Sequence, residues 1–211
     1  MIRVDSRPSL VLATNNKHKV SEIRAILKRS ALRVRVLTLE DFPRRRPTVE
    51  DQTTLEGNAR KKAMEAAQHT GCLSLADDTG LFVKALRGQP GVYSARFAGP
   101  GCSYEDNCRK LLRLMRQVPA SRRQAVFRTV AALATPDGYC ETVEGRISGR
   151  IWTRSLGERG FGYDPVFYVP RYKKTFAQMS FSLKNKISHR SKAFARVPAI
   201  LRATLRARPA N

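Results

Sequence analysis

Apolar residues recur along the first half of the chain with two spacings that alternate. Continuous apolar runs at 9–14 and 72–76 predict buried strands, and alternating apolar and basic residues over 32–39 are typical of a half-exposed strand. Between the strands at 9–14 and 32–39, apolar residues three and four apart over 20–27 predict an amphipathic helix. This order predicts that the chain opens as an α/β unit.

Residues that favour helix ends predict the limits of two further helices. Thr53 and Glu56 have the spacing of a capping box, which predicts an alanine-rich helix running to about His69, with Gly71 ending it. Ser103 is a second predicted N-cap, because the apolar residues that follow it at helical spacing are Leu111, Leu112, Met115 and Val118.

The second half of the chain begins with a predicted pair of long strands. Apolar runs at 125–135 and 139–151 are separated by Pro-Asp-Gly, which predicts an antiparallel hairpin. A further strand is predicted at 165–169. From about Ser182 the chain is expected to be helical to near its end, with an interruption or restart at Pro198.

These elements predict a mixed α/β fold. We expect an elongated mixed sheet with flanking helices, forming two lobes with the active-site cleft between them. The 211 residues suit one domain with two lobes, spanning 1–211, with flexible ends at about 1–8 and 207–211.

Composition narrows the class of protein without choosing its function. The 42% hydrophobic content is that of an ordinary globular chain. No segment approaches the ~18 continuous apolar residues of a membrane helix, and no signal peptide is visible, so we expect a cytoplasmic protein. The four cysteines form no CxxC pair, which favours free thiols over disulfides or a zinc site.

The chain is strongly basic, with 40 Lys and Arg against 17 Asp and Glu and a formal net charge of +23. This charge indicates anionic partners, which include nucleotides, nucleic acids and acidic proteins. The arginines are scattered along the chain, and no RNA-binding or helix-turn-helix signature accompanies them. We therefore expect no specific nucleic-acid partner.

Two polar stretches follow predicted strands of the first half. The first lies before a helix N-terminus, where backbone amides and the helix dipole attract anions, although a plain N-cap would have the same sequence. Its residues are Thr14, Asn15, Asn16, Lys17, His18 and Lys19. The second is the adjacent pair Asp77 and Asp78, which either form a turn with Thr79 and Gly80 or hold a hard cation such as Mg²⁺ at a strand end.

Two more polar stretches lie in the second half. Glycines at 160–162 let the backbone approach a flat ligand, and Phe161, Tyr163 and Asp164 could stack on a base or accept its hydrogen bonds; a Gly-rich turn is the alternative. The other stretch contains basic residues near a predicted helix start, where they oppose the helix dipole: Lys184, Lys186, His189 and Arg190. A solvated basic face is the alternative for that stretch.

Together these stretches supply what an enzyme acting on a nucleoside triphosphate needs, and six motifs in this order carry a family resemblance. The motifs are "LATNNKHK", "TLEGNARKKA", "LADDTGL", "PGVYSARFAG", "FGYDPVF" and "KNKISHR". Over residues 10–205 the chain resembles the inosine/xanthosine triphosphate pyrophosphatase family. The resemblance implies Mg²⁺-dependent hydrolysis of ITP, dITP and XTP to the monophosphate and pyrophosphate by a homodimer.

The resemblance also implies roles for individual residues. Asp78 matches the general base and metal ligand, and Glu50 matches a second metal ligand, with the adjacent Asp51 as the alternative. Asp77 is expected to buttress the site or to bind metal. Phosphate contacts are implied for Thr14 to Lys19 and for Lys62. The remaining implied nucleotide contacts are Thr79, Phe161, Gly162, Tyr163, Asp164, Lys184, His189 and Arg190.

Two other functions stay open at this point. The charge and the Arg-rich C-terminal segment are compatible with a nucleic-acid-binding module. A nucleoside triphosphate pyrophosphatase of different base preference, such as one acting on modified pyrimidines, would share most of these motifs. Pyrophosphate release from a panel of nucleotides separates all three.

Overall fold

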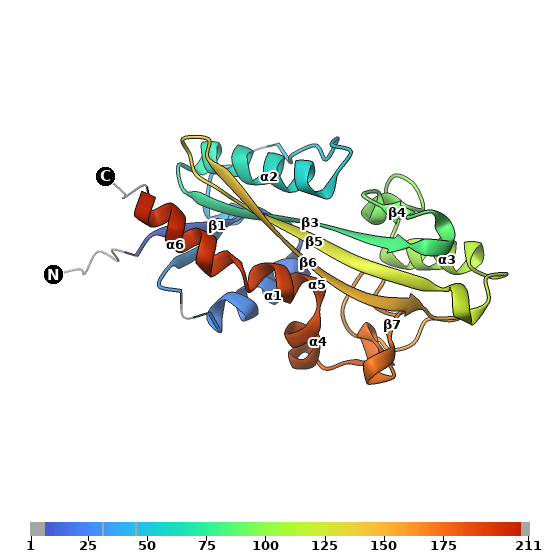
Figure 1. The fold of residues 1–211 in the computed structure, drawn as a ribbon. Coiled ribbons are helices and arrows are strands. Elements are labelled where there is room, and N and C mark those ends of the chain that lie inside the picture. The colour runs from blue at the N-terminus through green and yellow to red at the C-terminus, as the bar shows by residue number, and fades with distance from the viewer. Residues whose placement is uncertain (1–6, 31, 45, 208–211) are drawn as a thin grey trace. The chain divides into compact units, whose positions relative to one another are not determined.

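The computed structural model describes residues 7–30, 32–44 and 46–207. Six α-helices are present in this part of the chain: α1 (Lys17–Lys28), α2 (Leu55–Thr70), α3 (Tyr104–Leu114), α4 (Phe181–Ile187), α5 (His189–Phe194) and α6 (Val197–Ala207) (Figure 1). The strands are β1 (Ser9–Leu12), β2 (Arg35–Thr38), β3 (Leu73–Val83), β4 (Pro90–Gly91), β5 (Gln124–Ala134), β6 (Cys140–Ile151), β7 (Phe167–Val169) and β8 (Lys174–Thr175).

The described strands hydrogen-bond in the order β2-β1-β3-β5-β6-β7-β8, and β4 pairs with β3. β1 is parallel to both β2 and β3, as expected when a helix connects successive strands. The short strands β4, β7 and β8 pair antiparallel with their neighbours. The predicted mixed α/β sheet with flanking helices is therefore confirmed.

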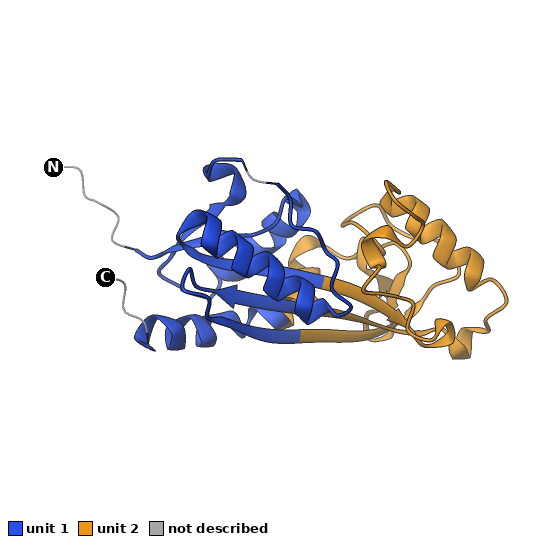
Figure 2. Ribbon diagram, turned by 90° about the horizontal axis from the view of Figure 1, so that it is seen from above, with its two compact units in different colours: residues 1–78, 130–144, 193–211 blue, residues 79–129, 145–192 orange. Residues whose placement is uncertain are grey.

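The chain divides into two compact units, and the chain passes between them within β3, β5, β6 and α5. Unit 1 consists of 1–78, 130–144 and 193–211, and unit 2 of 79–129 and 145–192 (Figure 2). The flexible ends expected at 1–8 and 207–211 lie largely outside the described residues. In the described part of the chain, no helix has the length and apolar character needed to span a membrane.

The core of unit 1 is built by helices on both faces of its strands. Alternate residues of β1 point to opposite faces, so Leu10 and Leu12 pack with the apolar sides of α1 and α6. Figure 1 shows α2 on the other face of these strands, where its small buried residues allow close packing. Those residues include Ala59, Ala63 and Ala67, which are all fully buried.

The core of unit 2 is more aromatic. Phe127 of β5 contacts both Phe167 and Phe176, with ring centroids 4.6 and 6.0 Å away, and those two rings lie 5.1 Å from each other. Leu111 of α3 and Met115, which caps the end of this helix, belong to the same cluster, together with Tyr163 and Val166 of the loop before β7. This packing places the loop at 160–164 against the core of unit 2.

Helix ends agree with the sequence at most positions, with one correction. The N-cap of α2 is Thr54, whose hydroxyl accepts a hydrogen bond from the amide of Gly57; the capping box predicted at Thr53 is wrong by one residue. Thr54 has an extended backbone and its hydroxyl satisfies a free amide of the first turn, so the helix starts at the next residue, Leu55. Gly71 ends α2 with φ of +66°, as predicted.

The prediction that a strand ends before Asp77 is wrong, because β3 continues to Val83. Residues beyond the acidic pair are held in the sheet by β4, with Leu81 opposite Gly91 and Phe82 opposite Pro90. The last helical segment restarts at Val197, one residue from the restart predicted at Pro198, but it also breaks at Ser188, which was not expected. Lys184 and Lys186 therefore lie in the last turn of α4, where positive charge is favourable to the helix dipole.

Candidate active site

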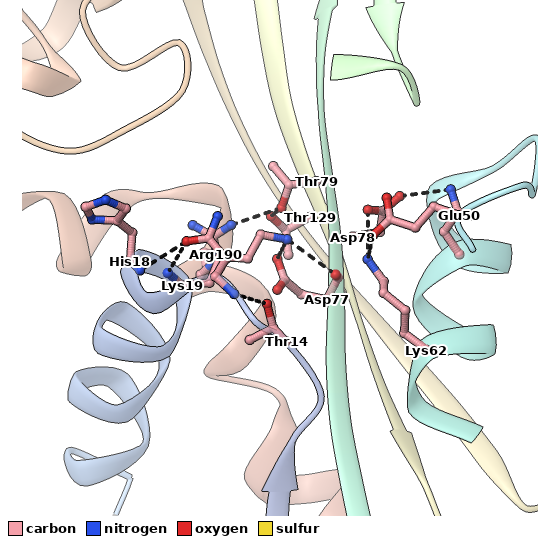
Figure 3. Close-up of polar contacts among 12 residues, drawn as sticks. Thr14, His18, Lys19, Glu50, Lys62, Asp77, Asp78, Thr79, Thr129 and Arg190 are labelled. Carbon is pink, nitrogen blue, oxygen red and sulfur yellow. Dashed lines mark hydrogen bonds and ion pairs between the residues drawn. The ribbon is translucent and has the colours of Figure 1, made fainter. Parts of the chain in front are cut away.

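Two carboxylates converge on one lysine beside β3 in unit 1 (Figure 3). The ammonium of Lys62 lies 3.1 Å from Oδ1 of Asp78 and 2.8 Å from Oε1 of Glu50. Asn58 lies one turn before Lys62 on α2 and donates from Nδ2 to the other carboxylate oxygen of Asp78, at 3.3 Å. The side chains of Lys62 and Asp78 are only 11% and 8% exposed, whereas that of Glu50 is 32% exposed.

The adjacent acid, Asp77, lies on the opposite face of β3. Figure 3 shows the two carboxylates projecting to opposite sides of the strand, as alternation along a strand requires. Lys19 of α1 forms an ion pair with Oδ2 of Asp77 at 3.2 Å, and the Asp77 side chain is fully buried. One strand thus presents a carboxylate to α1 and its neighbour to α2.

Burial sets the electrostatics of this cluster. Burial raises the pKa of Asp78 above its ordinary value, and the nearby Lys62 and Lys19 oppose this rise without cancelling it. Burial alone would lower the pKa of Lys62, but the carboxylates of Asp78 and Glu50 outweigh it and raise that pKa. Lys62 is therefore protonated at neutral pH, beside a carboxylate that is more basic than an exposed one.

The structure separates the two acids that the sequence left as alternatives. Asp51 is turned outward and forms an exposed ion pair with Lys61 at 2.8 Å. Glu50 instead reaches the lysine that also contacts Asp78. The structure therefore brings Glu50, and not Asp51, together with Asp78.

The turn between β1 and α1 is a well-formed helix start. Asn16 is the N-cap, and its side-chain oxygen accepts from the amides of His18 and Lys19 at 3.0 and 3.2 Å. Its own amide donates to the hydroxyl of Thr14 at 3.2 Å. Asn15, Lys17 and His18 are exposed. Asn16 is therefore the N-cap of α1, and Lys19 is the member of this turn that reaches the acidic strand.

A second charged pair lies under the glycine-rich loop of unit 2. Lys184 donates to Oδ2 of Asp164, and both side chains are almost fully buried. The same oxygen of Asp164 accepts the amide of Phe161 at 2.9 Å, which closes the loop on itself. Tyr163 is buried and donates its hydroxyl to the carbonyl of Ser94 at 2.9 Å.

The remaining predicted nucleotide contacts lie around the Phe161 ring and the core of unit 2. Arg190 is almost fully buried, with Cζ 5.5 Å from the centre of the Phe161 ring, and it donates to the hydroxyl of Thr79 at 3.2 Å. Lys184 also lies over the Phe161 ring, at 4.9 Å. His189 is stacked on Phe127 at 4.4 Å and is buried, so its ring packs in the aromatic core.

Sequence reasoning missed two residues of these clusters. Asn58 contacts Asp78, and its position four residues before Lys62 on one helix face was a signal that could have identified it. Thr129 of β5 shares a hydrogen bond of 2.7 Å with Thr79, and no local signal marks it because its partner is far away in the sequence. The predicted residues thus form two groups, one in each unit.

Fold and clusters together define a mixed α/β protein whose charged side chains gather beside the long interior strand β3. Residues 10–199 match the Ham1 family. The chain therefore belongs to the Ham1 family, and the resemblance inferred from the six motifs is confirmed.

Relatives in this family are close over nearly the whole chain. The dITP/XTP pyrophosphatase of Desulforamulus reducens is 50% identical over 192 residues, which cover 91% of this chain and 94% of that protein. That of Elusimicrobium minutum is 48% identical over 190 residues, covering 89% and 96%. The solved structure of the Staphylococcus aureus Ham1 protein has a TM-score of 0.81 at 37% identity, covering 92% of this chain and 98% of that one.

Proposed function

We propose that this protein is a divalent-metal-dependent nucleoside triphosphate pyrophosphatase that hydrolyses dITP, XTP and ITP. The products are the nucleoside monophosphate and pyrophosphate, so the enzyme removes non-canonical purines from the nucleotide pool. The observation that carries the proposal is the convergence of Asp78 and Glu50 on the ammonium of Lys62. Relatives of up to 50% identity that are named for this activity support it.

The donor set of this cluster fits Mg²⁺. Carboxylate oxygens are the ligands that Mg²⁺ prefers, and it commonly takes one or two of them together with phosphate oxygens and water. Oxygens of Asp78 and Glu50 already face one positively charged atom, the Lys62 ammonium. Among the described residues, no group of three or more His, Cys, Asp or Glu is placed to hold a metal ion. We assign Asp78 and Glu50 as the residues that hold Mg²⁺, which when bound offsets the charge of the triphosphate.

Asp78 is the general base of the proposed reaction. Its buried carboxylate has a raised pKa, which favours taking a proton from the attacking water. Asn58 donates to one carboxylate oxygen and so orients the carboxylate, also when Lys62 leaves the other oxygen for phosphate. Asp77 has the role of a buttress, because its ion pair with Lys19 ties β3 to α1.

Lysines on both faces of β3 stabilise the charge of the leaving pyrophosphate in this proposal. Lys62 is protonated and exchanges its carboxylate contacts for phosphate oxygens, which develop charge as the bond to the leaving group breaks. Lys19 and the N-terminus of α1 attract phosphate from the other face. Thr14, Asn15, Lys17 and His18 surround that helix start.

Unit 2 supplies the base selectivity in this proposal. Phe161 presents an aromatic face for the purine ring, and Gly162 lets the backbone approach it. Arg190 and His189 are the side-chain donors for the 6-oxo group of hypoxanthine or xanthine, and an adenine 6-amino group would leave them unsatisfied. The other members of this group are Thr79, Tyr163, Asp164 and Lys184.

Pyrophosphate release tests the proposal. The protein is assayed with ITP, dITP, XTP, ATP, GTP and dUTP, with Mg²⁺ and with excess chelator. We expect rapid turnover of the first three nucleotides only, and loss of turnover without the metal. Equal turnover of ATP and ITP would contradict the purine selectivity. Nucleic-acid binding that persists in Asp78→Asn, with no pyrophosphate release from any nucleotide, would favour a binding module.

The homodimer implied by the resemblance stays a prediction, and so does the cytoplasmic location expected from the sequence. Light scattering of the purified protein at micromolar concentration measures the mass in solution, with 23.7 kDa as the value for one chain. A mass of one chain would contradict the dimer.

A further inference from the structure

Helix α3 contacts the base loop, which we define as residues 160–164, from two consecutive turns. The ring of Tyr104, at the first position of α3, lies 5.8 Å from the ring of Phe161 between centroids, at 47°. The thiol of Cys108, one turn later, donates to the carbonyl of Gly162 at 3.3 Å. Residues four apart share one face of a helix, so both contacts come from the same face of α3.

The base loop needs outside support at the position that α3 contacts. Gly160 and Gly162 have φ of +79° and +62°, a region that restricts other residues but leaves glycine free to move. Gly160 is wrapped tightly by Asp164, whose Oδ2 would lie 2.0 Å from an added Cβ. Around Gly162, in contrast, an added Cβ would meet no atom within 4 Å, and the thiol of Cys108 holds its carbonyl.

The thiol of Cys108 is a suitable donor. Burial raises its pKa to about 12, with smaller contributions from the carboxylates of Asp164 and Glu105, so the sulfur keeps its proton at neutral pH. The side chain is buried, which strengthens a weak S–H donor by excluding competing water. Cys108 is the one cysteine of the described chain that contacts the base loop in this way.

Helix α3 is itself held firmly. Asn107 is fully buried and bonds to two backbone groups of the preceding loop, accepting from the amide of Ala98 at 2.7 Å and donating to the carbonyl of Ala95 at 3.1 Å. At the start of the helix, Ser103 and Asp106 form a capping box. The segment at 94–98 also receives the hydroxyl of Tyr163. A rigid support therefore stands behind the loop.

We propose that Tyr104 and Cys108 are positioning residues that fix the conformation of the base loop and thereby set the affinity for the purine base. The ring of Tyr104 limits the orientation of Phe161, while Lys184 and Arg190 lie over that same ring. The thiol limits the backbone of Gly162. The kinetic part of this inference rests on the proposed function; the structural part does not.

Hydrogen exchange of the substrate-free protein tests the structural part. The amide of Phe161, which donates to Asp164, reports on loop opening. We expect exchange in 160–164 to accelerate about three- to tenfold in Tyr104→Ala and in Cys108→Ala, which is the range for losing one aromatic pair or one neutral hydrogen bond. Tyr104→Phe keeps the ring and Cys108→Ser keeps a donor, so both should exchange more slowly than the alanine variants.

Two matched controls separate loop positioning from general loosening. Leu114→Ala removes an apolar side chain of the same helix with the same exposure as Tyr104, 43% against 42%, at the end away from the base loop. Cys140→Ala removes a thiol in unit 1. Neither should change exchange in 160–164. Acceleration of the same size in either control would overturn the proposal.

Steady-state kinetics test the consequence for the substrate. We expect KM for ITP to rise about three- to tenfold in each alanine variant, with kcat within about twofold of the wild type, because a loosened loop weakens binding in ground and transition states alike. The double variant should fall short of the product of the single effects, since both contacts act on one loop.

The outcomes distinguish this inference from the proposed function. A wild type that releases no pyrophosphate from ITP would refute the function, and exchange would still decide whether α3 positions the loop. A raised KM with unchanged exchange would mean that these side chains touch the nucleotide directly, which overturns positioning. Unchanged exchange together with unchanged KM would refute the inference in an active enzyme.

Discussion

Each unit contains a buried pair of one aspartate and one lysine, and the two pairs differ in their surroundings. In unit 1, Lys62 is shared between Asp78 and Glu50, and the glutamate side chain is 32% exposed. In unit 2, Lys184 and Asp164 are 5% and 3% exposed, and the aromatic rings of Phe161 and Phe176 lie beneath the ammonium.

Under the proposed function, this difference fits one pair to catalysis and the other to holding a loop. In the proposed function Lys62 leaves Asp78 for a phosphate, and the partly exposed Glu50 beside it fits that role. Lys184 is sealed, and Asp164 also holds the amide of Phe161, so that pair fixes a loop conformation. Four changes test this comparison, from the largest expected effect to the smallest.

Asp78→Asn should reduce pyrophosphate release about 10³-fold, because general-base catalysis contributes 10²–10⁴-fold. The unfolding free energy should change by less than about 2 kcal/mol, since an asparagine removes a buried charge and Lys62 retains Glu50. Enzyme assay and urea unfolding measure the two effects. An active Asp78→Asn protein would show that the base lies elsewhere.

Lys62→Met should lower kcat about 10²-fold, the effect of losing one charged contact to developing negative charge. The neighbouring Lys61→Met is the matched control, because Lys61 pairs with Asp51 at the surface, where such a pair contributes little to stability. Its kcat should stay within about twofold of the wild type. Equal losses in both variants would indicate a general charge effect and would remove the special role of Lys62.

Much of the fold was predictable because local signals and packing agree. The alanine-rich α2 and its terminal Gly71, the cap at Ser103 and the β5–β6 hairpin all have residues whose intrinsic preferences match their surroundings. The continuation of β3 past Asp78 was not predictable, because Asp-Asp-Thr-Gly favours a turn and the pairing that overrides it comes from β4.

The residues of the candidate site were likewise predictable where the signal is local and not where it depends on distant segments. Thr14 to Lys19, Asp78 and the 160–164 loop were identified by motifs, since each is a contiguous stretch. The contacts that give those residues different environments come from distant segments: Lys19 with Asp77, Asn58 with Asp78, and Cys108 with Gly162. Pairwise contacts over such separations leave no periodic trace in one sequence.

Asp164→Asn makes the same isosteric change in the buried Lys184–Asp164 pair. Compared with Asp78→Asn, it should lower stability more and pyrophosphate release less. We expect the unfolding free energy to fall by about 3 kcal/mol, because Lys184 would stay buried after losing its carboxylate. KM for ITP should rise, since the backbone amide of Phe161 loses the charged oxygen that accepts its hydrogen bond. Urea unfolding beside Asp78→Asn is the measurement. If Asp78→Asn is the less stable of the two, the comparison fails.

The smallest expected effect concerns Cys108, which lies beside the sealed pair. Burial, with Asp164 and Glu105 adding to it, raises the pKa of its thiol from 9.0 to about 12. The unfolded thiol ionises first as pH rises, so the native state binds more protons and its stability falls with pH. The contribution of the protonated Cys108 thiol to the unfolding free energy is complete below pH 9. It is lost between pH 9 and about 12, at up to about 1.4 kcal/mol per pH unit.

Cys108→Ala should therefore show a flatter decline of unfolding free energy above pH 9 than the wild type, with Cys140→Ala as the control for a less buried thiol. Urea unfolding at pH 8, 9 and 10 measures the slopes, and all other titrating groups cancel in the difference. The expected gap between the slopes of wild type and Cys108→Ala is at most about 1.4 kcal/mol per pH unit. Parallel slopes would mean that water reaches the sulfur, and the surroundings of Asp164 would then be no more sealed than those of Asp78.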